Sequence, residues 1–271
     1  MIRSFVLSAG LVLPWALYAQ SGAFQWPGGA RAGVALTYDD GIDGHLDIAM
    51  PDLEKANLRG TFYVPGNSAS LRKRMEEWRA AARRGHELGN HTLFHPCLTK
   101  IPGYERKWVT PLHALDNYTV PRMGEEIHVM NTLLLAVDAQ SVRTLAYPCG
   151  DEIAGGASYV DTIRPEVPAA RGYRRGGKDL AGPRTVDPYR VPGWAVEGAS
   201  GAELIAWVEE AAQSGKLAVF IFHGVGGGHS INVARESHAE LLKWLDAHRD
   251  RVWTAPFLKV MEHVMAERNR R

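Results

Sequence analysis

The sequence lacks a long basic run and has almost no excess of either charge, since its formal net charge is +1. This balance argues against a nucleic-acid partner and suits uncharged ligands such as neutral glycans. The glycine-rich segment 224–229 lacks the third glycine of the dinucleotide fingerprint and the Gly-Lys-Ser/Thr ending of a phosphate-binding loop. We therefore expect neither a nucleic acid nor a nucleotide as partner, and we interpret this segment as a loop at the mouth of a groove.

A membrane-spanning run is also missing. The N-terminal apolar segment 5–19 is shorter than the roughly 20 residues that a transmembrane helix needs, and Pro14 interrupts it. We therefore expect no stable membrane anchor once this segment is cleaved, although an N-terminal hydrophobic helix or a membrane anchor is the alternative interpretation.

The same segment has the parts of a secretory signal. Arg3 supplies the charge before the apolar run, and small residues follow the run. We expect a signal peptide over residues 1–23, cleaved after Ala19 or Ala23, and hence a secreted or periplasmic protein. The absence of cysteine from this region argues against a lipid-anchored start. No linker, low-complexity block or internal repeat divides the remainder, so residues 24–271 are expected to form a single catalytic domain.

Cysteine is scarce, with Cys97 and Cys149 the only two in 271 residues. In an exported chain, two cysteines pair more often than they stay as thiols. We expect a disulfide between them, with two unpaired buried thiols as the alternative. If both segments line one site, the bridge would clamp them together.

Strand-like runs alternate with helical patterns along the chain. The strand-like runs lie at 33–38, 60–64, 143–147, 188–191, 217–223 and 251–254. The helical patterns lie at 45–57, 69–84, 123–137, 200–214 and 237–248. This alternation predicts an α/β fold with a parallel sheet. The length suits either one α/β barrel or two smaller domains.

Two of the expected helices carry start signals. Ser200 with Glu203 forms a capping box, and Gly215 follows the last turn of that helix. Ser237 with Glu240 repeats the box ahead of the next helix. We expect a helix to begin directly after each serine.

Two short segments carry the chemistry. Asp39 and Asp40 follow the strand-like run at 33–38, and His91 and His95 stand four residues apart. One carboxylate with two imidazoles is a usual ligand set for a catalytic divalent ion, and it leaves a coordination position open. The second carboxylate is then free to act as a base on water. The combination predicts a metal-dependent hydrolase.

Each motif has a plainer interpretation by itself. Adjacent aspartates before Gly41 usually form a turn, and paired histidines often mark the surface of a helix. Pro96, directly after His95, favours a loop over a helix. His223 follows the apolar run 217–222, and such a histidine is as often a satisfied core residue as a functional one.

Together, the motifs resemble those of the polysaccharide deacetylases of carbohydrate esterase family 4, which share the NodB homology domain. The similar segments are Thr37-Tyr38-Asp39-Asp40-Gly41, His91-Thr92-Leu93-Phe94-His95 and Ile221-Phe222-His223. The similarity runs from Arg31 to Phe257 and so covers nearly the whole expected domain. It implies a NodB-like fold, a distorted (β/α) barrel of seven or eight strands with its catalytic residues at the carboxyl ends of the strands.

The resemblance also implies roles for single residues. The implied ligands of one divalent ion, zinc or alternatively cobalt, nickel or manganese, are Asp40, His91 and His95. Asp39 is implied as the base, and His223 as the acid that protonates the leaving group. The backbone N–H of Cys149 is implied as a donor to the oxyanion.

Two of the motifs depart from the family. Ala146 stands where an arginine usually tethers the catalytic aspartate, and Arg190 is our candidate substitute, with a surface cation as the alternative. The aspartate that usually precedes the tryptophan is a glycine, so either Asp187 or Glu197 is left to orient the catalytic histidine. The substrate-binding candidates are Trp194, Tyr147 and His229, with Trp108 as a further contact.

The function expected from the resemblance is removal of acetyl groups from N-acetylated carbohydrate polymers or oligomers, chitin-like or peptidoglycan-like. The same machinery cleaves esters, so an O-acetyl esterase acting on xylan or a similar glycan is the first alternative. A carbohydrate-binding protein with a relict site is the second, and Ala146 keeps it open. A cyclic amide hydrolase of the same superfamily is the third.

Overall fold

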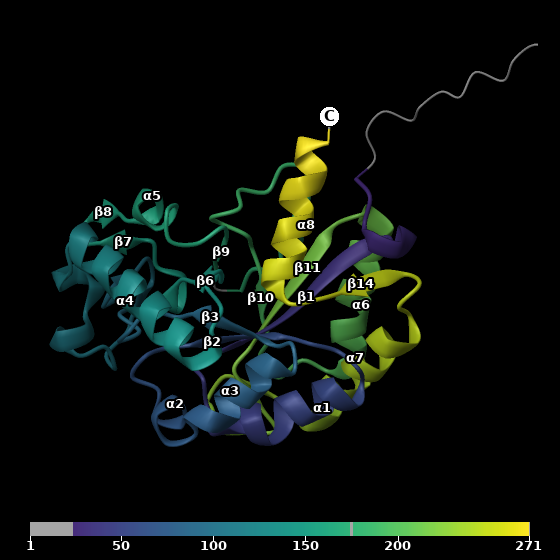
Figure 1. The fold of residues 1–271 in the computed structure, drawn as a ribbon, viewed down its shortest axis with the longest axis horizontal. Helices are drawn as coiled ribbons and strands as arrows, with labels where there is room; N and C mark the ends of the chain where they lie inside the picture. The colour runs from purple at the N-terminus through teal and green to yellow at the C-terminus, as the bar shows by residue number, and fades with distance from the viewer. Residues whose placement is uncertain (1–23, 174–175, 271) are drawn as a thin grey trace, which may run out of the picture.

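A computed structural model describes residues 24–173 and 176–270, so the expected signal peptide over 1–23 lies outside the described residues and remains a prediction. One parallel sheet organises the described chain (Figure 1). Its strands in spatial order are β10 (Trp194–Ala195), β11 (Leu217–Phe222), β1 (Ala32–Asp39), β2 (Thr61–Val64), β3 (Glu87–Asn90), β6 (Leu145–Ala146) and β9 (Ala170–Arg171), and β14 (Val252–Thr254) also pairs with β1. The expected parallel α/β architecture is confirmed.

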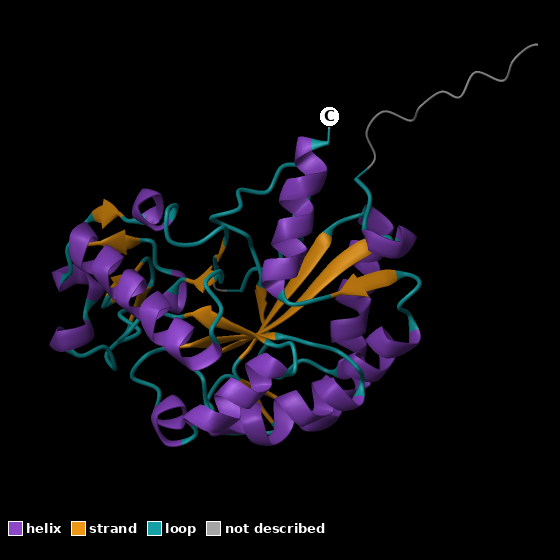
Figure 2. Ribbon diagram, viewed as in Figure 1, coloured by secondary structure: helices purple, strands orange, loops and turns teal. Residues whose placement is uncertain are grey.

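Helices surround the strands (Figure 2). They are α1 (Met50–Lys55), α2 (Ala69–Lys73), α3 (Met75–Arg83), α4 (Val120–Asp138), α5 (Val160–Ile163), α6 (Gly201–Ser214), α7 (Arg235–Ala247) and α8 (Phe257–Asn269). The short helical turns are η1 (Pro27–Gly29), η2 (His45–Ala49), η3 (Pro111–His113), η4 (Leu115–Asn117) and η5 (Pro148–Gly150). Three small ribbons pair β4 (Lys100–Ile101) with β5 (Tyr104–Glu105), β7 (Ile153–Ala154) with β8 (Ala157–Ser158), and β12 (Gly224–Val225) with β13 (Asn232–Val233). Among the residues described, no helix is both long enough and apolar enough to cross a membrane.

One of the two expected helix starts is confirmed and one is wrong. The Ser200 hydroxyl accepts from the backbone N–H of Glu203, and the Glu203 carboxylate accepts from the backbone N–H of Ser200, so the capping box is complete. By contrast, α7 begins at Arg235 after Ala234, with no side-chain cap. Ser237 therefore lies inside the first turn of α7, because the helix begins two residues before it.

The segment 188–195 links the two edges of the sheet. The predicted strand at 188–191 is not a regular strand, yet Val191 donates to the Ala170 carbonyl at 3.1 Å and accepts from the Gly172 N–H at 2.9 Å. The chain then reaches β10, which pairs with β11 at the opposite edge. This one segment brings β9 and β11 together, so the sheet curls into the expected distorted barrel.

Alternation along β1 places the candidate base. All eight residues of β1 are buried. Val34, Leu36 and Tyr38 belong to one hydrophobic cluster, with α6 and α7, whereas Ala35 belongs to another, which includes α8. Side chains alternate between the faces of a strand, so Asp39 leaves β1 on the same face as Ala35.

Candidate metal and catalytic site

The carboxyl ends of the strands open into one cavity of about 930 Å³. The expected site residues that line it are Asp39, Asp40, His91, His95, Tyr147, Cys149, His223 and His229. These residues follow β1, β3, β6 and β11 and come from distant parts of the sequence. Of the residues expected to act here, Trp194, Arg190 and Asp187 do not line the cavity, whereas Glu197 does.

The backbone around the cavity is strained. Asp40, Thr92, His95 and Cys149 have φ values of 80°, 65°, 52° and 56°, which L-residues seldom adopt. Each such residue costs on the order of 1–3 kcal/mol, and such residues gather at functional sites. The turn at Asp40, directly after β1, lets two consecutive carboxylates line the same cavity. The roles predicted for Asp39 and Asp40 need this arrangement.

The expected ligand atoms are close enough to share an ion. Asp40 Oδ1 lies 3.3 Å from His95 Nε2 and 3.6 Å from His91 Nε2. Two atoms that each lie about 2.1 Å from one metal ion, at a near-tetrahedral angle, are about 3.4 Å apart. One carboxylate and two imidazoles at this spacing fit a divalent transition ion.

Contacts behind the two histidines leave the Nε2 atoms free for a metal. His91 Nδ1 lies 2.9 Å from the carbonyl of Ala146, so this nitrogen is the donor and Nε2 keeps its lone pair. Burial lowers the pKa of His95 to about 4, which leaves its ring neutral near pH 7.

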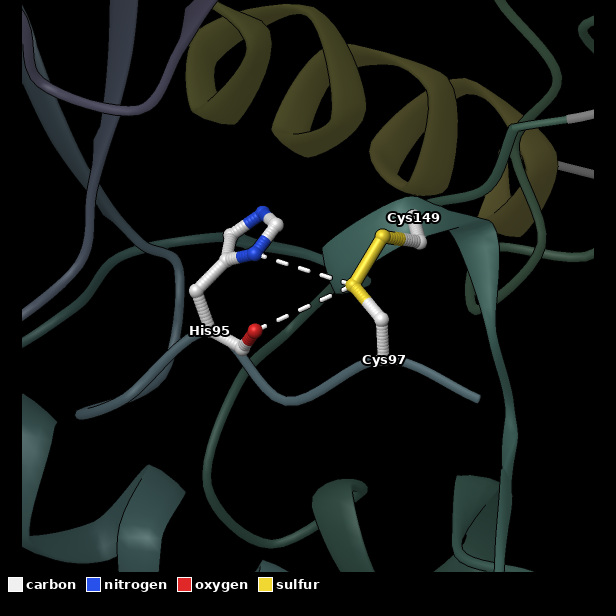
Figure 3. A group of neighbouring side chains, drawn as sticks. All are labelled: His95, Cys97 and Cys149. Atoms are coloured by element: carbon white, nitrogen blue, oxygen red, sulfur yellow. Dashed lines mark hydrogen bonds between the residues drawn. A yellow bond between two sulfur atoms is a disulfide. The ribbon is translucent and has the colours of Figure 1, made fainter. Parts of the chain in front are cut away.

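The Cys97–Cys149 disulfide expected from the sequence is present and lies beside the loop that carries His95. Figure 3 shows the ring of His95 against it, with Nδ1 3.7 Å from Cys97 Sγ. A disulfide sulfur has no proton to donate, so the His95 Nδ1–H is the donor in this weak contact. The group of His95 and the two sulfurs is not a metal site of its own, because oxidised cysteines offer no thiolate.

A buried arginine holds the candidate base. Arg171 Nη2 lies 2.6 Å and 2.5 Å from the two carboxylate oxygens of Asp39, and both residues are buried. Burial alone would raise the pKa of Asp39, but the Arg171 guanidinium lowers it below its usual value. Asp39 is therefore ionised and fixed in orientation, as a general base must be.

The expectation that Arg190 provides this tether is wrong. Arg190 is exposed and pairs with Glu152 at 2.7 Å and with Asp187 at 3.1 Å. It lies on the outer side of the segment 188–195, where its long side chain reaches water and two surface carboxylates. A surface cation was the alternative interpretation, and it is the correct one.

Comparisons with known proteins agree with this geometry. The profile of the polysaccharide deacetylase family matches residues 28–164, half of the chain. This chain belongs to the polysaccharide deacetylase family.

The chain is 38% identical over 85 residues to a peptidoglycan-N-acetylglucosamine deacetylase of Bacillus cereus, and the match covers 31% of this chain and 28% of that protein. A chitin deacetylase of Colletotrichum lindemuthianum is 34% identical over 76 residues, 27% of this chain and 31% of that protein. The matched segments thus span less than a third of these two relatives.

Solved structures share the fold over most of the chain. A Mycobacterium smegmatis protein assigned to the polysaccharide deacetylases has a TM-score of 0.63 at 16% identity, covering 90% of this chain and 93% of that one. A family 4 pseudoenzyme of Bacillus anthracis has a TM-score of 0.51 at 14% identity, covering 86% and 66%. Because the fold occurs in a pseudoenzyme too, activity has to be argued from the residues of this family member.

The arginine that pairs with Asp39 comes from a different strand than is usual in the family, and strand pairing explains how it reaches the same place. Ala146 on β6 and Arg171 on β9 are direct partners in the parallel ladder. The arginine is therefore missing from the usual strand and present at the paired position of its neighbour, about 5 Å away. Sequence reasoning missed Arg171 because β9 has only two residues, too few for a periodic pattern. The only signal was an arginine directly after a short apolar run.

His223 directly follows β11, which β1 and β2 separate from β3 in the sheet. Its carbonyl accepts from His45 Nε2 at 2.8 Å, and burial lowers the pKa of the His223 ring below its usual value. Within the described chain its Nδ1 has no hydrogen-bond partner, so neither Asp187 nor Glu197 orients it as expected. Asp187 is instead engaged with Arg190 and with the Tyr189 N–H.

Trp194 is a core residue and not a wall of the substrate site, contrary to expectation. It is 6% exposed and packs edge-on against Trp207, with ring centroids 5.3 Å apart. β10 directs the indole outward into the layer of α6, because the adjacent Gly193 is the residue that faces Ile221. Tyr147 does line the cavity, and its hydroxyl donates to the Tyr189 carbonyl at 2.9 Å.

Removing the disulfide should destabilise the protein. The bond closes a loop of 52 residues, for which chain entropy predicts a loss of about 4 kcal/mol of unfolding free energy. We expect the C97A/C149A variant to show this loss in urea denaturation. It should also bind metal more weakly, because His95 loses the sulfur that its ring rests on. An unchanged urea midpoint would contradict the prediction.

Proposed function

We propose that this protein is a metal-dependent hydrolase that removes acetyl groups from N-acetylated carbohydrate polymers or oligomers. The observation that carries the proposal is the buried ion pair between Asp39 and Arg171. An inactive site would not need a buried arginine that keeps the base ionised and oriented. Here that arginine is present on β9, the strand paired with β6, where the family usually has it. This pair therefore supports catalysis over a binding protein that has lost its activity.

The residues divide the chemistry among them. When bound by Asp40, His91 and His95, a divalent ion such as zinc polarises a carbonyl and makes water more acidic. Asp39 takes a proton from the attacking water. His223 donates a proton to the leaving nitrogen. The Cys149 N–H is our candidate donor to the oxyanion, since Cys149 lines the cavity.

A glycan fits the rim of the cavity. Tyr104 and Trp108, 42% and 58% exposed, line it together with Ile101 on the β4–β5 hairpin and the chain after it. Such exposed aromatic side chains offer flat apolar surfaces for the C–H faces of sugar rings. A buried ion pair between Arg106 and Asp151, 2.5 Å apart, holds the chain after the β4–β5 hairpin in place.

Two relatives are named for chitin and peptidoglycan deacetylation, which supports an N-acetylated substrate. An O-acetyl esterase acting on xylan or a similar glycan remains the second candidate, because the same residues would attack an ester. The disulfide supports an oxidising compartment, so we also propose that the protein works outside the cytosol, in the periplasm or secreted.

Acetate release tests the proposal. The metal-loaded protein should release acetate from chitooligosaccharides or peptidoglycan faster than from acetylxylan, and chelation should abolish the release until metal is restored. Preference for acetylxylan would favour the esterase. No acetate from any of the three, with metal bound and glycan binding retained, would favour the binding protein.

Trp108→Ala should weaken the use of long substrates. Loss of one stacked apolar face is worth about 1 kcal/mol, or about a fivefold higher KM. We expect this rise with chitohexaose, little change with chitobiose, and an unchanged kcat, measured as initial rates of acetate release. Leu112→Ala is the matched control, since Leu112 is 69% exposed and does not line the cavity. Equal KM values for Trp108→Ala and the wild type would reject the aromatic rim as a sugar-binding surface.

A further inference from the structure

The glycine-rich loop after β11 carries His229 into the site. Gly226, Gly227 and Gly228 have φ values of 70°, 116° and 81°, which other residues rarely adopt. The loop leaves β12 and returns at β13, and these two strands pair with each other. Three consecutive glycines thus allow a tight loop, which places His229 in the lining of the cavity. None of the motifs that identified the family includes this loop.

His229 contacts two residues of the site. Its Nε2 lies 3.4 Å from Asp40 Oδ2, and its ring stacks on that of His223 with centroids 4.9 Å apart. The side chain is 28% exposed and lines the cavity. A role limited to substrate contact, as expected from the sequence, does not account for its approach to a metal ligand.

The hydrogen bonds of the loop fix the tautomer of His229. The backbone N–H of Ile231 donates to His229 Nδ1 at 3.0 Å, so this nitrogen presents its lone pair. The Ile231 carbonyl also lies near Nδ1, at 3.2 Å, but it already accepts from the Gly224 N–H at 3.0 Å. A neutral imidazole has one N–H, which must then be at Nε2. This is the nitrogen that lies 3.4 Å from Asp40 Oδ2.

The two oxygens of Asp40 therefore have different neighbours. Oδ1 faces His91 and His95, the other expected ligands, whereas Oδ2 faces the N–H of His229. A carboxylate that is held at one oxygen presents the other in a fixed direction. Groups that orient a ligand in this way commonly change metal affinity by about 10–100-fold.

We propose that His229 is a positioning residue for the metal site. Its Nε2–H donates to Asp40 Oδ2 and holds the carboxylate so that Oδ1 completes the ligand set with His91 and His95. The glycine-rich loop places that donor beside Asp40. The inference rests on the proposed metal site, but it does not depend on which substrate is cleaved.

Metal affinity in the absence of substrate is the direct test. Apoprotein is titrated with Zn²⁺ against a chromogenic chelator, and His229→Ala should bind about 10–100-fold more weakly than the wild type. His229→Gln should recover most of the affinity, because its amide NH₂ reaches the position of Nε2. His229→Asn should not, because its shorter amide reaches only the position of Nδ1. His128→Ala is the control, since His128 is exposed on α4 and pairs with Glu166.

Three results would overturn the proposal. Unchanged affinity in His229→Ala would show that the donor is dispensable. Failure of His229→Gln to recover affinity, with a changed visible spectrum of the Co²⁺-loaded protein, would make His229 a ligand and not a positioning residue. Unchanged affinity in His91→Ala would remove the metal site itself and the proposed function with it. Thermal unfolding of each apoprotein variant excludes a loss of fold as the cause of weak binding.

Discussion

Asp39→Asn should lower turnover by about 10²–10⁴-fold, the usual contribution of a general base, while metal affinity stays close to that of the wild type. The amide keeps the shape of the side chain but cannot take a proton from water. Asp40→Asn should instead weaken metal binding by more than about 100-fold, beyond the loss expected for a group that only orients a ligand. The difference arises because Asp39 is paired with Arg171, whereas Asp40 Oδ1 faces His91 and His95.

Both variants are measured in the same two assays, chelator competition for Zn²⁺ and acetate release at saturating metal. The rates are taken well below the unfolding temperature, because Asp39→Asn leaves the Arg171 guanidinium without its carboxylate. If Asp39→Asn released the metal and Asp40→Asn kept it, the roles of the two aspartates would be reversed.

Arg171→Met should cost about 3–5 kcal/mol of unfolding free energy, because it leaves the buried Asp39 carboxylate unpaired. Turnover should fall as well, since the base loses both its orientation and the charge that keeps its pKa low. Urea denaturation in the presence of a chelator measures the stability term, because bound metal would add stability of its own.

Two further variants sharpen this test. Asp39→Asn combined with Arg171→Met removes both charges and should recover most of the lost stability, although not the activity. Arg190→Met, which removes an exposed pair, should change stability by no more than about 1 kcal/mol. Equal losses in Arg171→Met and Arg190→Met would mean that the buried pair has no special role.

Local sequence patterns predicted the groups that stand close together in the chain. The two aspartates end one strand, the two histidines occupy one loop, and His223 ends another strand. Pro96 indicated a loop around His95, and none of residues 91–96 is helical. In these cases a few neighbouring residues determine both the backbone conformation and the direction of the side chains.

The predictions that failed depended on strand pairing or on packing between distant segments. Arg190 and Trp194 are near one another in sequence and were expected in the site, but the segment 188–195 turns both away from it. Arg171 was not predicted, because its role depends on the pairing of β9 with β6. The helix start at Ser237 failed because the chain enters α7 from β13, two residues earlier than the serine.

The sequence by itself determined the family and the alternating α/β fold, and it indicated the candidate metal ligands and the candidate base and acid. It also indicated the disulfide. Only the tertiary structure decided which arginine faces Asp39 and which histidine faces the second oxygen of Asp40. The physical reason is that motif spacing acts over one turn or one strand end, whereas Arg171 and His229 reach the site through ladder register and a glycine-rich turn. Both residues lie far from Asp39 and Asp40 in the chain, and no local pattern links them.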